Sequence, residues 1–120
     1  MKICVIDDDL NTDTMSKFFQ MEGHECKVIH DGRAGLDILE KEDFDAVVLE
    51  LALPNFSGTD IIVKLEDTGR IKDHNICVYT ASISGERDYD YIKNRGVKEI
   101  IKKPIDLAIL LKYLEKIQKS

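Results

Sequence analysis

Four polar segments of this 120-residue chain carry side chains suited to chemistry, and each follows a short apolar run. They are Asp7-Asp8-Asp9, Glu50, Thr80 and Lys103. Clustered carboxylates repel one another unless a cation lies between them. Mg²⁺ takes oxygen ligands, commonly one or two carboxylates together with waters and phosphate oxygens. A magnesium ion, a lysine and a hydroxyl around one carboxylate would form a site for a phosphoryl group in transfer.

The elements that must position these residues alternate along the chain with a short period. Apolar runs predict strands over 2–6, 26–29, 46–49, 76–79 and 97–101. Amphipathic segments predict helices over 11–21, from an Asp31 cap to 41, over 59–67, over 85–94 and from an Asp106 cap to the end of the chain. This pattern predicts an α/β fold, the flavodoxin-like (βα)5 doubly wound parallel sheet with strand order 2-1-3-4-5. Ligands of such sheets bind outside the carboxyl ends of the strands, which is where the four polar segments begin.

Composition indicates one soluble globular domain over 1–120. Hydrophobic residues make up 43% and charged residues 33%, and the net charge of −6 makes a direct nucleic-acid surface a poor interpretation. No signal peptide or membrane-spanning run is visible, so we expect no membrane contact.

The cysteines and histidines are assigned no chemistry. Cys4, Cys26 and Cys77 lie in strand-like apolar runs, which predicts buried free thiols in a reducing, cytoplasmic compartment. The three histidines fall in loop-like contexts, and we expect them to be exposed to solvent: His24, His30 and His74.

Taken together, the motifs resemble the receiver domain of two-component response regulators, the CheY-like proteins. Asp7-Asp8-Asp9 by itself is compatible with a polar turn that caps a helix. The resemblance covers nearly the whole chain, and its motifs occur in the right order, each after a predicted strand: Val5-Ile6-Asp7-Asp8-Asp9, Leu49-Glu50-Leu51-Ala52-Leu53-Pro54 with Gly58, Tyr79-Thr80-Ala81 and Lys102-Lys103-Pro104.

The resemblance implies a Mg²⁺ cofactor and a set of ligands. Asp7 and Asp8 correspond to the acidic pair that holds the metal, Asp8 directly and Asp7 through water. The backbone carbonyl of Ala52 and the carboxylate at position 50 complete the implied ligand set.

It also implies two switch residues. Thr80 corresponds to the hydroxyl that turns toward the phosphoryl group, and Lys103 to the lysine that pairs with that group. The Lys103–Pro104 peptide bond is expected to be cis, as is usual in the family. Ile100 stands where the family often has a rotating Tyr or Phe, which puts the usual coupling to the threonine in doubt.

The main departure from the family is Glu50, which lies four residues before Pro54, at the position of the phosphoacceptor aspartate. The extra methylene moves the carboxylate by about one bond length, and a misplacement of ~1 Å can cost on the order of 100-fold in rate. We therefore expect a poor phosphoacceptor. Its carboxylate is expected to occupy part of the missing phosphoryl group's space, near Thr80 and Lys103, with one negative charge where a phosphoryl group has nearly two.

Two functions follow from these observations. The first is a stand-alone receiver in a phosphorelay, served by a sensor histidine kinase or phosphotransfer protein and acting on a downstream protein target. Such a domain has self-phosphorylation and dephosphorylation chemistry, impaired here by Glu50, and is no conventional enzyme. The second is a phosphorylation-independent interaction module with a receiver fold.

The sequence also contains a candidate contact face. Apolar residues of the 85–94 helix, the 97–101 strand and the last helix would form a face for a partner or a homodimer, or they are scattered surface residues: Tyr89, Tyr91, Ile100, Ile109 and Tyr113.

Overall fold

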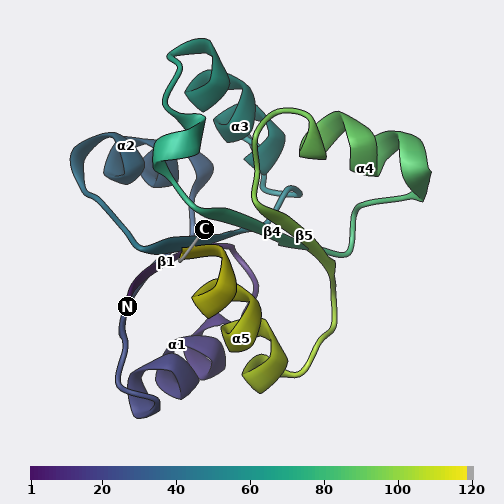
Figure 1. Ribbon diagram of the computed structural model, residues 1–120. Helices are drawn as coiled ribbons and strands as arrows, with labels where there is room; N and C mark the ends of the chain where they lie inside the picture. Colours follow the sequence, from purple (N-terminus) through teal and green to yellow (C-terminus); the bar gives the residue numbers. More distant parts are fainter. Residues whose placement is uncertain (119–120) are drawn as a thin grey trace.

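A five-stranded parallel sheet between two layers of helices makes up the fold (Figure 1). The computed structural model describes residues 1–118. In chain order the elements are β1 (Lys2–Ile6), α1 (Thr12–Met21), β2 (Glu25–Ile29), α2 (Gly32–Lys41), β3 (Ala46–Leu49), α3 (Gly58–Asp67), the 3₁₀ turn η1 (Ile71–Asp73), β4 (Ile76–Thr80), α4 (Gly85–Lys93), β5 (Glu99–Lys102) and α5 (Leu107–Gln118).

The strand order is β2-β1-β3-β4-β5, and every neighbouring pair is parallel. This confirms the predicted flavodoxin-like order. The apolar runs of β1 and β3 lie side by side, with Ile6 opposite Leu49, so the residues that follow them emerge together at the carboxyl edge. β2 is an edge strand, which accommodates the polar Lys27.

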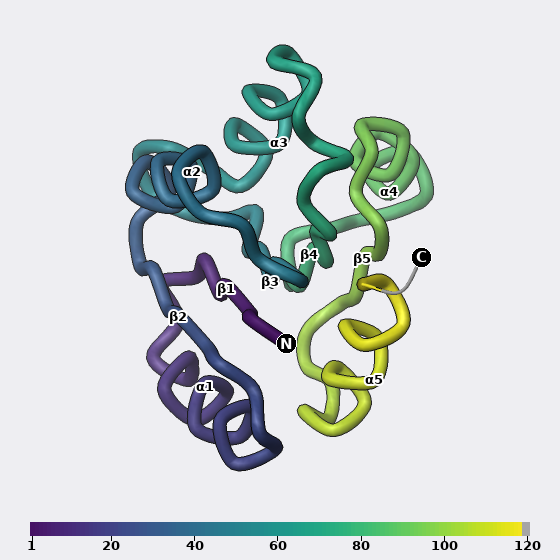
Figure 2. Tube along the Cα trace, turned by 60° about the vertical axis from the view of Figure 1, so that its left-hand side comes forward, coloured from purple at the N-terminus to yellow at the C-terminus, as the bar shows by residue number. Residues whose placement is uncertain are grey.

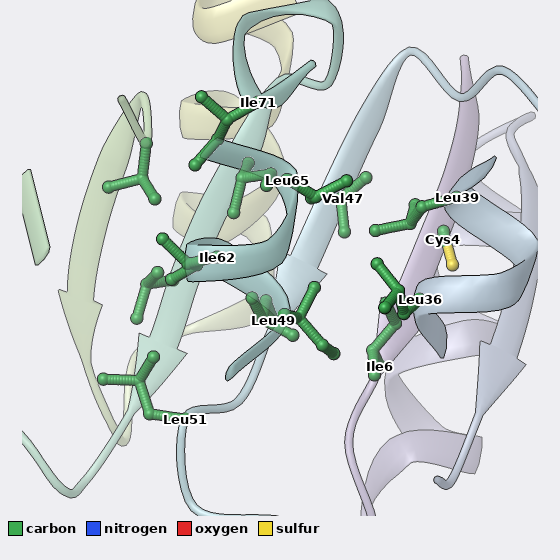
Figure 3. Packing of buried hydrophobic residues seen from close by; sticks show 14 of the residues in the cluster. Cys4, Ile6, Leu36, Leu39, Val47, Leu49, Leu51, Ile62, Leu65 and Ile71 are labelled. Carbon is green, nitrogen blue, oxygen red and sulfur yellow. The ribbon is translucent and has the colours of Figure 1, made fainter. Parts of the chain in front are cut away.

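Each face of the sheet supports its own hydrophobic core. One core packs α2 and α3 against the sheet through residues such as Leu39 and Ile62 (Figure 3), and α4 joins it through Ile92. The other packs α1 and α5 against the opposite face, through residues such as Phe19 and Leu114. Figures 1 and 2 show this division, with α1 and α5 together on one side of the sheet. Side chains buried on both faces explain why the central strands are continuously apolar.

Local capping sets where several helices begin. The Asp31 side chain accepts a hydrogen bond from the Ala34 amide at 2.9 Å, as the sequence predicts. Asp106 likewise accepts from the Ala108 amide at the start of α5, at 2.8 Å. Among the helices of residues 1–118, none has the length and apolar character that crossing a lipid bilayer requires.

Some sequence expectations differ from the structure. β5 begins at Glu99 rather than at Val97, which is buried in the core just before the strand. His74 was expected at the surface but is only 1% exposed, in the short connection between η1 and β4. Burial, with a smaller effect from the Arg70 charge, lowers the pKa of His74. All three cysteines are free thiols, although Cys26 is only half-buried.

Candidate functional site

The carboxyl ends of β1, β3 and β5 bring three of the predicted site residues into direct contact. Asp7 follows β1, Glu50 follows β3 and Lys103 follows β5. Backbone hydrogen bonds fix the first two strand ends, since the Glu50 amide donates to the Ile6 carbonyl at 3.0 Å and the Asp7 amide to the Ile29 carbonyl at 3.0 Å. Residues up to 96 positions apart thus meet at one edge of the sheet.

The Lys103 ammonium lies among three carboxylates. Its Nζ is 2.7 Å from Asp7 Oδ2, 3.1 Å from Glu50 Oε1 and 3.6 Å from Asp9 Oδ2. Burial is the largest single influence and disfavours the charged amine, but the hydrogen bonds to Asp7 and Glu50 outweigh it, so the pKa of Lys103 is raised. The lysine is therefore the resident counter-ion of the acidic edge. Its peptide bond to Pro104 is cis.

Glu50 uses both of its carboxylate oxygens within the protein. Oε1 contacts Lys103, and Oε2 accepts a hydrogen bond from the Ala52 amide at 3.2 Å. The residue is only 7% exposed. The loop after it folds back closely, because the Gly58 amide donates to the Leu51 carbonyl at 2.9 Å. A Cβ at position 58 would clash with the Glu50 carbonyl, so glycine is required there.

Thr80 is fully buried at the end of β4, and its hydroxyl is directed to its own loop. Its Oγ1 accepts a hydrogen bond from the Ser82 amide at 3.0 Å. Within residues 1–118, no hydrogen bond joins Thr80 and Glu50. Of the two contacts expected for the Glu50 carboxylate, the one with Lys103 is formed and the one with the Thr80 hydroxyl is not.

The oxygen donors named for a metal are only partly gathered. Asp8 is exposed, and its side chain makes no hydrogen bond or ion pair with the rest of residues 1–118. Asp7 and Glu50 instead neutralise Lys103, and in the described part of the chain no three His, Cys, Asp or Glu side chains form a metal-binding group. The donor chemistry, carboxylates plus the nearby Ala52 carbonyl, nevertheless suits the hard Mg²⁺ ion.

A cavity of about 410 Å³ opens beside these residues, between the start of α1 and the connection from β5 to α5. Asp9, Met15, Tyr79 and Lys103 are among the residues that line it. Neither Asp9 nor Tyr79 was assigned a separate role from the sequence. The place of Asp9 in the acidic run 7–9 could have indicated that it belongs to the site. No sequence feature around Tyr79 indicated that it lies next to Lys103.

Comparisons with known proteins agree with this architecture. Residues 3–115 match the family described as the response regulator receiver domain. The response regulator MprA of Mycobacterium avium is 30% identical over 112 residues, which cover 92% of this chain and 48% of MprA. The transcriptional regulatory protein YclJ of Bacillus subtilis is 35% identical over 72 residues, which cover 59% of this chain and 32% of YclJ. The chain thus spans about half, or less, of the length of these curated relatives.

Solved receiver structures share the fold. A CheY-like receiver from Methanospirillum hungatei superposes with a TM-score of 0.87 at 22% identity, covering 98% of this chain and 93% of that one. The receiver domain of sensor histidine kinase PA1611 from Pseudomonas aeruginosa, which has a magnesium ion coordinated in its active site cleft, gives 0.84 at 20% identity, covering 99% and 98%. At these identities the likeness concerns the fold. With the family match over nearly the whole chain, it follows that this protein belongs to the response regulator receiver family of two-component signalling.

Proposed function

We propose that this chain is a receiver switch in which Glu50 occupies the phosphoacceptor position and holds Lys103 with a permanent negative charge. The observation that carries the proposal is the 3.1 Å contact between the buried Glu50 carboxylate and the Lys103 ammonium. The hydrogen bond from the Ala52 amide to the other Glu50 oxygen supports the proposal. The Lys103 ammonium and the Ala52 N–H are both positive groups, and together they suit an anion at the position of the Glu50 carboxylate. The carboxylate supplies one negative charge, whereas a phosphoryl group carries about −1.5 to −2.

The mimicry is incomplete at the second switch residue. Thr80 stays bonded to the Ser82 amide and makes no bond to Glu50. The Glu50 carboxylate thus contacts the lysine while the Thr80 hydroxyl stays bonded to the Ser82 amide. We infer that the switch is in an intermediate state, in which Lys103, after β5, contacts the charge at position 50 and Thr80, at the end of β4, does not.

Mg²⁺ is part of the proposed site. Asp8 is the best candidate for a direct ligand because its exposed carboxylate has no partner in the described residues. Asp7, Glu50 and the Ala52 carbonyl would complete the set. The ion would supply a second positive charge for a phosphoryl group, and the protein's own Lys103 already supplies the first.

The proposed partners are those of the family: a sensor histidine kinase or phosphotransfer protein upstream and a protein target downstream, in the cytoplasm. The curated relatives are longer than this chain, and a stand-alone role is part of the proposal. A homodimer through the α4, β5 and α5 face belongs to the same proposal. Tyr91 of α4 and Ile109 of α5 are each 46% exposed, which supports a contact face there.

A phosphorylation-independent interaction module is the second candidate. It is favoured by Ile100, which packs against the core and cannot swing as an aromatic switch residue would. It is also favoured by Glu50 itself, whose oxygens both have protein partners.

The experiment that separates the candidates is phosphoryl incorporation, measured by intact mass with a small-molecule phosphodonor and Mg²⁺. It compares this chain with Glu50→Asp, which restores the shorter side chain, and with Glu50→Asp/Lys103→Met as the control. We expect incorporation in Glu50→Asp alone, since Lys103 would be needed for the reaction. Incorporation in neither Glu50→Asp nor the parent would overturn retained phosphotransfer and leave the module. Incorporation in the parent would refute the reasoning about the added methylene.

A further inference from the structure

The Lys103 side chain has more than one acidic partner within reach. The Lys103 ammonium contacts Asp7 and Glu50 at the strand ends, and the cavity of about 410 Å³ that it lines with Asp7 also carries the partly exposed carboxylate of Asp9. A lysine side chain has several rotatable bonds and loses considerable conformational freedom when it is held in one place. A further element that holds the side chain beside Asp7 and Glu50 would therefore support these ion pairs.

Tyr79, the residue before Thr80, provides that element with its ring. The Lys103 Nζ lies 5.4 Å from the centre of the Tyr79 ring, within the range of a cation–π contact. The tyrosine is only 6% exposed and belongs to the core under α1 and α5, so its ring has little freedom to move. The Tyr79 ring is thus a rigid, electron-rich surface that lines the cavity beside the Lys103 ammonium.

The hydroxyl of the same tyrosine holds the backbone beyond Lys103. It accepts a hydrogen bond from the Ile105 amide at 3.1 Å. The Lys103 amide donates to the carbonyl of Thr80 at 2.9 Å, and Pro104 has no amide hydrogen to donate. Consecutive residues of β4 therefore hold the chain on both sides of Pro104, and one of these two anchors is a side-chain atom of Tyr79.

We propose that Tyr79 is the positioning residue for Lys103: its hydroxyl fixes the connection from β5 to α5, and its ring helps to hold the ammonium beside Asp7 and Glu50. The contacts of Tyr79 with Ile105 and Lys103 do not depend on the proposed switch function. The consequence for switching rests on the proposed function, because only there does the lysine read the charge at position 50.

The test is the relative acylation of lysines by an amine-reactive ester at about pH 8, quantified by peptide mass spectrometry. Reactivity depends on access of the ester to the Lys103 Nζ, and this access is low while the 16% exposed side chain is paired with Asp7. Lys112, exposed on α5, is the internal reference. We expect Tyr79→Phe, which keeps the ring, to raise the Lys103:Lys112 ratio about threefold, and Tyr79→Leu, which removes both contacts, to raise it about tenfold.

The control is Ile117→Val, which removes a methylene from the same core without touching Lys103. It should leave the ratio unchanged even where it lowers stability. An unchanged ratio in both tyrosine variants would overturn the proposal, and so would a parallel rise at both lysines, which indicates general loosening. Because the assay needs no phosphoryl transfer, its result is independent of whether Glu50→Asp accepts phosphoryl.

Discussion

Removal of the Lys103 charge is the most direct perturbation of this site. In Lys103→Met the apolar stem is kept and the ammonium is lost, which leaves Asp7 and Glu50, 2% and 7% exposed, without their counter-ion. Breaking a buried ion pair by removing one partner costs about 3–5 kcal/mol. Lys103 retains some exposure and Asp9 lies partly in water, so screening favours the lower end.

We therefore expect Lys103→Met to lower the free energy of unfolding by about 3 kcal/mol, or the Tm by about 10 °C. The assay is urea unfolding followed by circular dichroism, in buffer without divalent ions. The matched control is Lys102→Met at the neighbouring exposed lysine, which should stay within about 0.5 kcal/mol of the parent.

Glu50→Gln completes a double-mutant cycle. In the parent it removes an ion pair, whereas in Lys103→Met it removes an unpaired buried charge and should restore part of the lost stability. We expect a coupling energy of at least about 1 kcal/mol between the two positions. A Lys103→Met cost below about 1 kcal/mol, or equal effects of Glu50→Gln in both backgrounds, would refute the view that these charges hold one another.

Two further predictions concern Asp8 and His74. Asp8→Asn should weaken Mg²⁺ binding, measured by calorimetric titration, by about tenfold or more, while Asp13→Asn on the exposed side of α1 should not; equal affinities would exclude Asp8 as a ligand. Since burial lowers the pKa of His74 from its ordinary value of 6.5, the unfolded chain takes up the proton first, and stability is full above that pH and falls as the pH drops below it. His74→Leu should flatten this part of the stability profile in urea unfolding at several pH values, and an unchanged slope would contradict the assignment.

Much of the fold could be predicted because the signals are local. The buried run of β3 and the Asp31 cap are decided by residues within a few positions of one another. The alternation of strands and helices then leaves few possible parallel topologies, since crossovers are right-handed. The shared edge of Asp7, Glu50 and Lys103 follows from that topology alone.

The sequence by itself thus determined the elements, the strand order and the edge at which the polar residues gather. Only the tertiary structure decided which atoms meet there: that Lys103 is bound by Asp7 and Glu50, that Thr80 bonds to Ser82, and that Tyr79 supports the lysine. The physical reason is that such contacts depend on side-chain rotamers and on packing between segments far apart in the chain. His74 illustrates the same limit, because it is buried in the tertiary structure although its sequence context, between η1 and β4, is that of a loop.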